Sequence, residues 1–507
     1  MKIERTKNAA RNIVFNGSSQ MFNMLVPFIM RSVMLNFLGV KYLGLSGLFR
    51  SILSILNLAE LGVGSTMVFS MYKPVAEDDT ETICAMMKLY RTIYRIIGLI
   101  ILAVGLILVP FLPHLIKGDV PEDINLYILY FMNLGSTVVS YWLFAYKNCL
   151  LSAHQRSDIS SKINMAARFV EYSLKIAVLA VFRNYYLYLA IQIISQILIN
   201  ILVAMRVNKL FPGYSPRGDL PKEKKLGIAR RVRDLFTSNF SYVISNSADT
   251  LVISSFLGLT TLAIYQNYYY IVSSLKTMVE VVVGACIAGI GNSLITESSE
   301  KNYRDLRKMT VIFGWIMCFS SSMTLCLYQP FMELWMGEEH MLAFEYVVCF
   351  VIYFYSIGMN KLINMFKDAA GIWREDKWRP LTAALVNLFL NLATVKWLGL
   401  YGVLLSTVIS IVLVQIPWLF HNLFKLVFPH EHLKEYSFFY IGFVVISLAS
   451  CVLSYLACSL FNLKALPTLF VNGAISFAIP NIIFILLYGR NKAFRTGVRD
   501  IVKKILK

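Results

Sequence analysis

The sequence predicts an all-α integral membrane protein with about fourteen transmembrane helices, arranged as two parallel six-helix lobes around a central cavity plus two C-terminal helices. Three observations lead to this fold class. Of the 507 residues, 57% are hydrophobic and only 15% are charged, whereas a soluble globular chain carries about 25% charged residues. The apolar residues fall in long blocks, and the basic residues gather between alternate blocks. An ordinary soluble protein is therefore excluded.

Each apolar block of about 20 residues predicts a membrane-spanning helix, because a helix satisfies its own backbone hydrogen bonds in hydrocarbon. The predicted spans are 12–36, 43–71, 92–114, 124–150, 165–183, 185–205, 236–257, 262–294, 310–330, 341–364, 380–396, 400–420, 437–459 and 466–488. The first span is too long for a removable signal peptide. The longest connection, about 206–235, leaves no room for a water-soluble catalytic domain, which needs at least about 50 residues.

The placement of lysine and arginine predicts the orientation of the chain. With the amino terminus taken as cytoplasmic, 38 of the 48 lie in or beside the inner connections and five lie in the outer ones. Cytoplasmic loops of membrane proteins carry such an excess, so both termini are expected to be cytoplasmic. The basic segments 222–233 and 490–507 are interpreted as topological anchors that attract anionic membrane lipids, and nucleic acid is not expected as a partner.

The chain shows signs of an internal repeat. Phe37-Leu38-Gly39 follows the first span and Phe256-Leu257-Gly258 follows the seventh, with six identities over twenty positions at a constant offset of 219. An offset of six spans gives both copies the same orientation, and such parallel repeats enclose a substrate path between them. The predicted divisions are an N-terminal six-helix lobe (1–205), a basic cytoplasmic linker (206–235), a C-terminal six-helix lobe (236–420), and two additional helices with a basic cytoplasmic tail (421–507).

Polar residues recur along one face of several predicted spans. Charges inside a bilayer are costly and usually face a cavity or a partner, so we expect these faces to line a shared hydrated chamber. The positions are Asn16, Gln20, Asn23 and Arg31 in the first span, Arg50, Asn57 and Glu60 in the second, Asp249 in the seventh, and Lys276 and Glu280 in the eighth.

Each of these charges also has a structural explanation. Arg31 lies near its helix end and can extend to the membrane interface. Lys276 and Glu280 are four residues apart and can neutralise each other within one helix. In the fifth span, Arg168 is interpreted as an anchor at the cytoplasmic boundary, and the spacing of Glu171 and Lys175 permits a structural pair. The sequence leaves these alternatives open.

The motifs of several enzyme classes are missing from the sequence. It contains no G-x-x-x-x-G-K-[ST] phosphate loop, no G-x-S-x-G nucleophile elbow and no H-E-x-x-H metal helix. We therefore predict no catalytic residue, no metal ligand and no bound cofactor. A secondary transporter or flippase is the expected class, and a membrane polysaccharide polymerase or ligase, which would need an extended outer loop with catalytic groups, is the alternative from a different class.

One part of the chain resembles a known family. The resemblance lies in Leu38-Gly39, in 42–45 (YLGL), in 58–64 (LAELGVG) and in 71–76 (MYKPVA). This pattern resembles the amino-terminal region of bacterial Wzx-type polysaccharide flippases, members of the multidrug/oligosaccharidyl-lipid/polysaccharide exporter superfamily. The resemblance implies translocation of an undecaprenyl-diphosphate-linked oligosaccharide across the bacterial cytoplasmic membrane by alternating access, with polysaccharide assembly proteins as further partners.

The residues agree with such a substrate, because a diphosphate needs cations and arginine offers a fork for phosphate oxygens. The expected substrate-binding residues are Arg31, Arg50, Lys276, Asn23 and Asn57. Glu60, Asp249 and Glu280 are expected either to bind a coupling cation or proton or to balance the basic residues. A cation-coupled drug exporter would favour an acidic chamber, and a peptidoglycan-precursor flippase would share the anionic lipid anchor. These are the two rival functions within the superfamily.

Overall fold

The chain folds entirely into helices and connecting turns over the described residues. The computed structural model describes residues 5–60, 62–118, 120–461, 466–490 and 495. The long helices are α1 (Arg5–Phe37), α2 (Val40–Leu56), α3 (Val63–Ala76), α4 (Thr80–Leu108), α5 (Leu126–Trp142), α7 (Ser157–Phe182), α8 (Tyr185–Leu210), α9 (Lys222–Leu257), α10 (Leu259–Thr296), α11 (Ser299–Met336), α12 (Phe344–Ala369), α13 (Arg379–Leu398), α14 (Leu400–Ile409), α15 (Ile416–Leu426), α16 (His432–Ser459) and α17 (Leu466–Tyr488). Short helical turns are η1 (Asn57–Glu60), η2 (Val109–Leu115), η3 (Ala145–Lys147), α6 (Asn148–Ala153), η4 (Glu338–His340) and the π-helical η5 (Ser410–Gln415).

All fourteen predicted spans coincide with a helix or a helix pair, which confirms the predicted fold class. Within the described residues, nine helices are long and apolar enough to cross a membrane, and a bent pair formed by α5 and η3–α6 makes ten. The other four predicted spans are α1, α2–α3, α7 and α9. These helices carry polar residues along one face. Those residues lower the mean hydropathy of each helix, so the helices do not meet the criterion of length and apolar content that the other ten satisfy.

Two predicted spans are broken inside the membrane region. The span 43–71 consists of α2 and α3 with η1 between them, and Gly62 takes the left-handed conformation (φ 85°) that begins α3. The span 124–150 bends by 46° between Trp142 and Ala145, where Phe144 has φ 56°. Each break leaves backbone groups and side chains in directions that a continuous helix would not allow.

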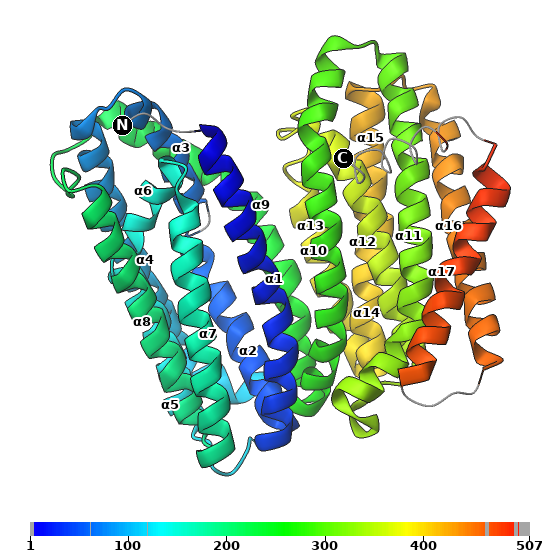
Figure 1. The fold of residues 1–507 in the computed structure, drawn as a ribbon, viewed down its shortest axis with the longest axis horizontal. Helices are drawn as coiled ribbons and strands as arrows, with labels where there is room; N and C mark the ends of the chain where they lie inside the picture. Colours follow the sequence, from blue (N-terminus) through cyan, green and yellow to red (C-terminus); the bar gives the residue numbers. More distant parts are fainter. Residues whose placement is uncertain (1–4, 61, 119, 462–465, 491–494, 496–507) are drawn as a thin grey trace. The chain divides into compact units, whose positions relative to one another are not determined.

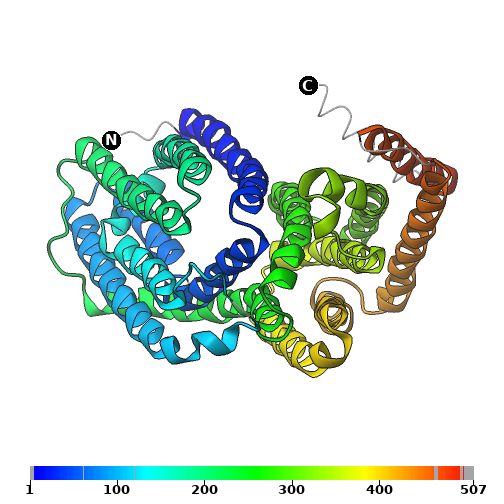
Figure 2. The ribbon, with the colours of Figure 1, turned by 90° about the horizontal axis from the view of Figure 1, so that it is seen from below.

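The chain divides into two compact units, Met1–Ala263 and Ile264–Lys507. In the first unit, α1 packs against α7, α2 packs against α9, and α4 packs against α5. The helices of this unit run side by side (Figures 1 and 2). The predicted lobe boundaries follow the internal repeat, which this packing does not test, and they stay a prediction. The two Phe-Leu-Gly turns nevertheless share one backbone conformation, with φ/ψ of 99°/173° at Gly39 and 92°/173° at Gly258.

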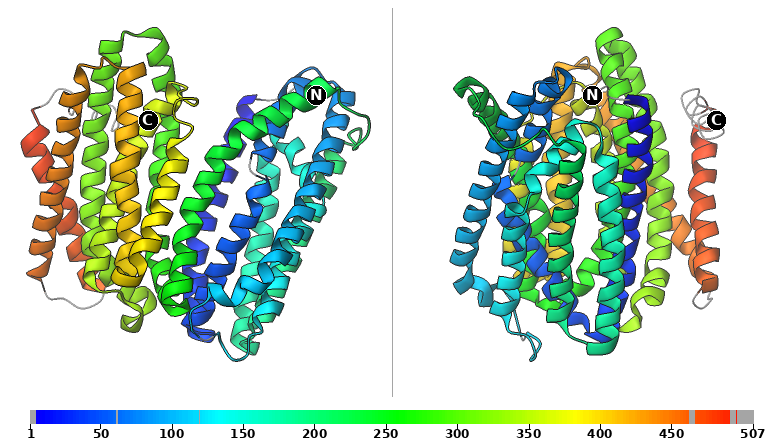
Figure 3. Two further views of the ribbon diagram at one scale, coloured as in Figure 1. Left: turned by 180° about the vertical axis from the view of Figure 1, so that it is seen from behind. Right: turned by 60° about the vertical axis from the view of Figure 1, so that its left-hand side comes forward.

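In the second unit, α11 is the helix around which its neighbours pack. It contacts α12 on one side and the pair α16 and α17 on another. The last two helices are antiparallel neighbours at the edge of this unit (Figure 3). Gly314 of α11 permits close packing against Phe443 of α16, because a Cβ at Gly314 would lie 2.5 Å from the Phe443 ring.

The close approach of α2 to the start of α10 generates a stability prediction. A Cβ at Gly44 would lie 2.3 Å from the backbone oxygen of Leu259, and backbone cannot move aside as a flexible side chain can. We expect Gly44→Ala to destabilise the protein by about 1–3 kcal/mol through overpacking, seen as a lower midpoint of thermal unfolding in detergent. Gly135→Ala is the matched control, because a Cβ at Gly135 on α5 would meet nothing within 4 Å. An unchanged midpoint for Gly44→Ala would contradict the close approach.

Candidate functional site

Glu60 is enclosed by a cluster of tyrosines inside the first unit. It ends η1, at the break between α2 and α3. The hydroxyl of Tyr94 donates to Glu60 Oε1 at 2.5 Å and the hydroxyl of Tyr141 donates to Glu60 Oε2 at 2.6 Å. Tyr90, one turn before Tyr94 on α4, donates to the Tyr94 hydroxyl at 2.6 Å. We call Tyr90, Tyr94 and Tyr141 the tyrosine cluster, and two of its hydroxyls donate to the two carboxylate oxygens of Glu60.

The two asparagines predicted to bind substrate occupy different surroundings. Asn57 begins η1, and its Oδ1 lies 3.2 Å from the hydroxyl of Tyr141. The structure therefore brings Asn57 and Glu60 together through one tyrosine. Asn23 is exposed on α1, and its amide donates to the hydroxyl of Ser19 at 3.4 Å, one turn earlier on the same helix.

The two predicted arginines lie on separate helices of the first unit and both are accessible. Arg31 is partly exposed on α1. Arg50 is exposed on α2, although Leu48 and Phe49, the two residues before it, are buried. The charge of Arg50 acts electrostatically on Tyr172 and Lys175 of α7 and on Tyr185 and Tyr188 of α8. Arg50 thus lies near both helices of the first unit, at a position that water can reach.

The charges of α7 form a buried structural group. Glu171 accepts a hydrogen bond from Arg168 at 2.7 Å and forms an ion pair with Lys175 at 2.6 Å, and both Glu171 and Lys175 are only 2% exposed. Two glutamines of α8 complete the group, since Lys175 donates to Gln192 at 3.0 Å and Arg168 donates to Gln196 at 3.2 Å. The structural explanation of Glu171 and Lys175 is therefore the correct one, and Arg168 belongs to the same group.

The second unit contains a cluster with two cations and one carboxylate. Glu280 of α10 pairs with Lys361 of α12 at 2.7 Å. Lys276, one turn before Glu280, interacts electrostatically with both of these residues. Glu280 is therefore not neutralised within its own helix alone, and these three residues contribute two cations and one carboxylate. Asp249, the third predicted acid, is buried on α9 of the first unit.

A further polar network centres on Arg379 and Asp376, two residues that reasoning from the sequence missed. Arg379 at the start of α13 donates twice to the carboxylate of Asp376, at 2.7 Å each, and is 4% exposed. It also donates to Asn364 of α12 at 2.9 Å and to Gln415 of the π-helical η5 at 3.3 Å. The spacing of Asp376 and Arg379 is the signal that could have indicated the pair. The partners from α12 and η5 are distant in the sequence.

The described acids of the polar helices differ from Arg50 in having close partners. Glu60 accepts from two phenol donors, Glu171 pairs with two cations and Glu280 pairs with a lysine. Arg50 is exposed, and the cluster of Lys276, Glu280 and Lys361 contains two cations and one carboxylate. Arginine and lysine in a region of low dielectric bind phosphate oxygens strongly.

Comparison with known proteins shows the fold. The sequence matches no family model and no curated protein. The structure is similar to that of the lipid II flippase MurJ in an inward closed conformation, with a TM-score of 0.70 at 14% identity over 94% of this chain and 99% of MurJ. It is also similar to an inward-facing multidrug resistance MATE transporter of the MOP superfamily, with a TM-score of 0.61 at 14% identity over 82% of this chain and 96% of that one.

A third similar structure is a MOP superfamily transporter from Pyrococcus furiosus, described as having a binding pocket of reverse polarity that suggests a different function. The TM-score is 0.53 at 13% identity, over 83% of this chain and 96% of that one. All three neighbours are membrane transporters or flippases. This chain therefore has the fold that these transporters and this flippase share.

The buried group on α7 yields a prediction that separates structural from functional charges. Glu171→Gln keeps the side-chain shape but leaves Lys175 and Arg168 without their carboxylate. We expect a loss of about 3 kcal/mol or more in the free energy of unfolding, because breaking a buried ion pair leaves an uncompensated charge. Thermal unfolding in detergent measures the effect. The control is Glu77→Gln, which removes an exposed pair with Lys73 and should leave the midpoint almost unchanged. Equal midpoints for both variants would contradict a structural role for Glu171.

Proposed function

We propose that the protein is a flippase that moves an undecaprenyl-diphosphate-linked oligosaccharide from the cytoplasmic to the outer leaflet of the bacterial cytoplasmic membrane by alternating access. The product would serve cell-surface polysaccharide assembly, together with polysaccharide assembly proteins. In this proposal both termini are cytoplasmic, as the distribution of basic residues indicates.

The accessibility of basic residues on the polar helix faces carries the proposal. A lipid-linked sugar presents a diphosphate, and moving it through a region of low dielectric requires compensating positive charge. Arg50 is exposed on α2, Arg31 is partly exposed on α1, and Lys276 lies beside Glu280 and Lys361 in the second unit. A cationic drug is disfavoured as substrate, because Glu60 and Glu280 already have partners.

A peptidoglycan precursor is the second candidate substrate. Among the structures compared, the lipid II flippase MurJ aligns over 94% of this chain, while the MATE transporter aligns over 82%. A lipid-linked peptidoglycan precursor and a lipid-linked oligosaccharide share the anionic anchor. The cationic residues bind that anchor in either case, so they do not discriminate between the two glycans.

Transport by arginine variants tests the proposed role of the cations. We expect Arg31→Ala and Arg50→Ala each to slow outer-leaflet delivery of a lipid-linked oligosaccharide by about ten- to a hundredfold, since a hydrogen bond to a charged group contributes about 1.5–3 kcal/mol. Arg50→Lys should lose less, because lysine keeps the charge but not the fork. The measurement is the rate at which the sugar of the lipid becomes accessible outside proteoliposomes that contain equal amounts of each variant.

The control variant is Arg95→Ala, which removes an exposed arginine on α4 that has no role in the proposal. Its rate should match that of the parent protein. Full transport by the double variant of Arg31 and Arg50 would remove both residues from the mechanism. Parallel vesicles that contain lipid II separate the two substrates, and transport of lipid II alone would assign the protein to peptidoglycan synthesis.

The energy source of transport is the second part of the proposal. We propose that a coupling cation or proton acts through at least one of Glu60, Asp249 and Glu280. Glu60 suits a proton, because its protonation would turn an acceptor of two phenol hydrogen bonds into a donor and rearrange the tyrosine cluster.

We therefore expect at least one of Glu60→Gln, Asp249→Asn and Glu280→Gln to weaken the dependence of transport on an imposed proton or sodium gradient. Initial rates with and without each gradient give the measurement, and Glu77→Gln supplies an exposed-acid control. Unchanged gradient dependence in all three variants would reject coupling through these carboxylates.

A further inference from the structure

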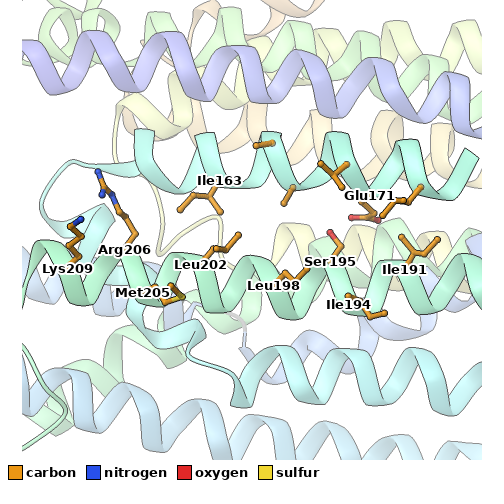
Figure 4. Close-up of a pocket in the computed structure, with 14 residues that line it drawn as sticks. Ile163, Glu171, Ile191, Ile194, Ser195, Leu198, Leu202, Met205, Arg206 and Lys209 are labelled. Carbon is orange, nitrogen blue, oxygen red and sulfur yellow. The ribbon is translucent and has the colours of Figure 1, made fainter. Parts of the chain in front are cut away.

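An apolar groove runs between α7 and α8 on the first unit. It has a volume of about 710 Å³. Side chains of both helices line it, and those of Val170, Leu174, Ile194, Leu198 and Leu202 are each at least two-fifths exposed. Figure 4 shows these helices side by side, with the lining residues directed between them. In a membrane, exposed apolar side chains on a transmembrane hairpin face acyl chains.

The two ends of the groove differ in charge. Arg206 and Lys209 lie together at one end, and Glu171 and Ile191 lie at the other (Figure 4). The charge of Glu171 is already balanced by Arg168 and Lys175. The groove is therefore apolar along its length. Its end at Glu171 carries no uncompensated charge, and its other end carries the two cations Arg206 and Lys209.

The groove is long enough for an acyl chain of one leaflet of a bilayer. Fifteen residues separate Ile191 from Arg206 on α8, which corresponds to about 22 Å along a helix. One leaflet contributes about 15 Å of hydrocarbon. Arg206 and Lys209 belong to the inner, basic connection, so an acyl chain in this groove would belong to the cytoplasmic leaflet with its headgroup at the two cations.

A second groove, in the other unit, provides a contrast. It has a volume of about 880 Å³ and lies among α11, α12, α14–α15 and α16. Its lining contains apolar, hydroxyl and aromatic side chains together with His421, but no lysine, arginine, aspartate or glutamate. A pair of cations at the cytoplasmic end is thus a property of the α7–α8 groove and not of both grooves.

We propose that the α7–α8 groove binds one anionic glycerophospholipid of the cytoplasmic leaflet, with its headgroup phosphate on Arg206 and Lys209 and an acyl chain along Leu198 and Leu202. Anionic lipid is the fitting occupant, because basic residues near the membrane surface attract it by about 1 kcal/mol each. The site rests on the cytoplasmic orientation proposed above and is independent of the transported substrate.

Lipid binding to the purified full-length chain tests this site without a transport assay. Native mass spectrometry in detergent gives the affinity for phosphatidylglycerol and for phosphatidylcholine with the same acyl chains. We expect the parent protein to prefer phosphatidylglycerol, and the double variant Arg206→Gln with Lys209→Gln to lose about 30-fold in affinity for it. The affinity of that variant for phosphatidylcholine should change little.

A second variant fills the groove instead of removing charge. Ala166 lines the groove and is exposed, so Ala166→Phe should displace both lipids at little cost to folding. Two controls match these changes. Lys425→Gln with Lys434→Gln removes two exposed basic residues of the second unit, and Leu448→Phe adds bulk to its groove. Both control proteins should bind phosphatidylglycerol as the parent does.

The outcomes separate the proposed lipid from other occupants. Loss of phosphatidylglycerol in both groove variants, with retention in both controls, supports the site. Equal affinity for phosphatidylglycerol in the parent and the two groove variants would overturn it. Selective displacement of undecaprenyl phosphate by Ala166→Phe, with phosphatidylglycerol unaffected, would assign the groove to the transported lipid and equally overturn the proposal. If the parent protein is a dimer in detergent and Ala166→Phe is a monomer, the groove contacts a second copy of the chain, which would also overturn the proposal.

Discussion

Every charge inside the membrane region of this protein has to be compensated, and this requirement explains most of its polar architecture. An unpaired ion in hydrocarbon destabilises the protein by several kcal/mol, which is more than a single van der Waals contact or hydrogen bond contributes to stability. The carboxylates meet the requirement in different ways: Glu171 through two cations of its own helix, Glu280 through Lys361 of a neighbouring helix, and Glu60 through two phenol hydroxyls. Among the described residues, these three acids thus already have partners, whereas Arg50 is exposed.

The helices that carry this chemistry could be predicted, but their breaks could not. Apolar blocks were enough to place α11, α12 and α16, since length and hydropathy alone determine whether a segment can span the membrane. The break between helices at Glu60 could not be predicted from hydropathy, because the surrounding residues 52–71 are mostly apolar, as in a continuous span. It depends on the left-handed conformation of Gly62 and on tyrosines from α4 and α5, which only the tertiary structure brings to that point.

The sequence also could not determine which residue forms an ion pair with each buried or partly buried carboxylate. Spacing along one helix suggested that Lys276 neutralises Glu280, and the same rule suggested the pair of Glu171 and Lys175. The rule was sufficient for Glu171 and Lys175, whose pair forms within α7. For Glu280 it was incomplete, because the 2.7 Å partner is Lys361, on a different helix and 81 positions away. A periodic pattern identifies the face of a helix, whereas the packing of the bundle decides what that face meets.

Compensation also distinguishes the arginine best suited to a ligand from those that hold the bundle together. Arg168 and Arg379 are tied to carboxylates and amides of their own units, so a ligand would have to displace existing bonds to use them. Arg50 is exposed beside buried neighbours and its charge acts on the tyrosines at the start of α8. Arg50 therefore lies where water can reach it, whereas Arg168 and Arg379 are held by carboxylates and amides of the protein, and this difference in surroundings separates it from the arginines that hold the helices together.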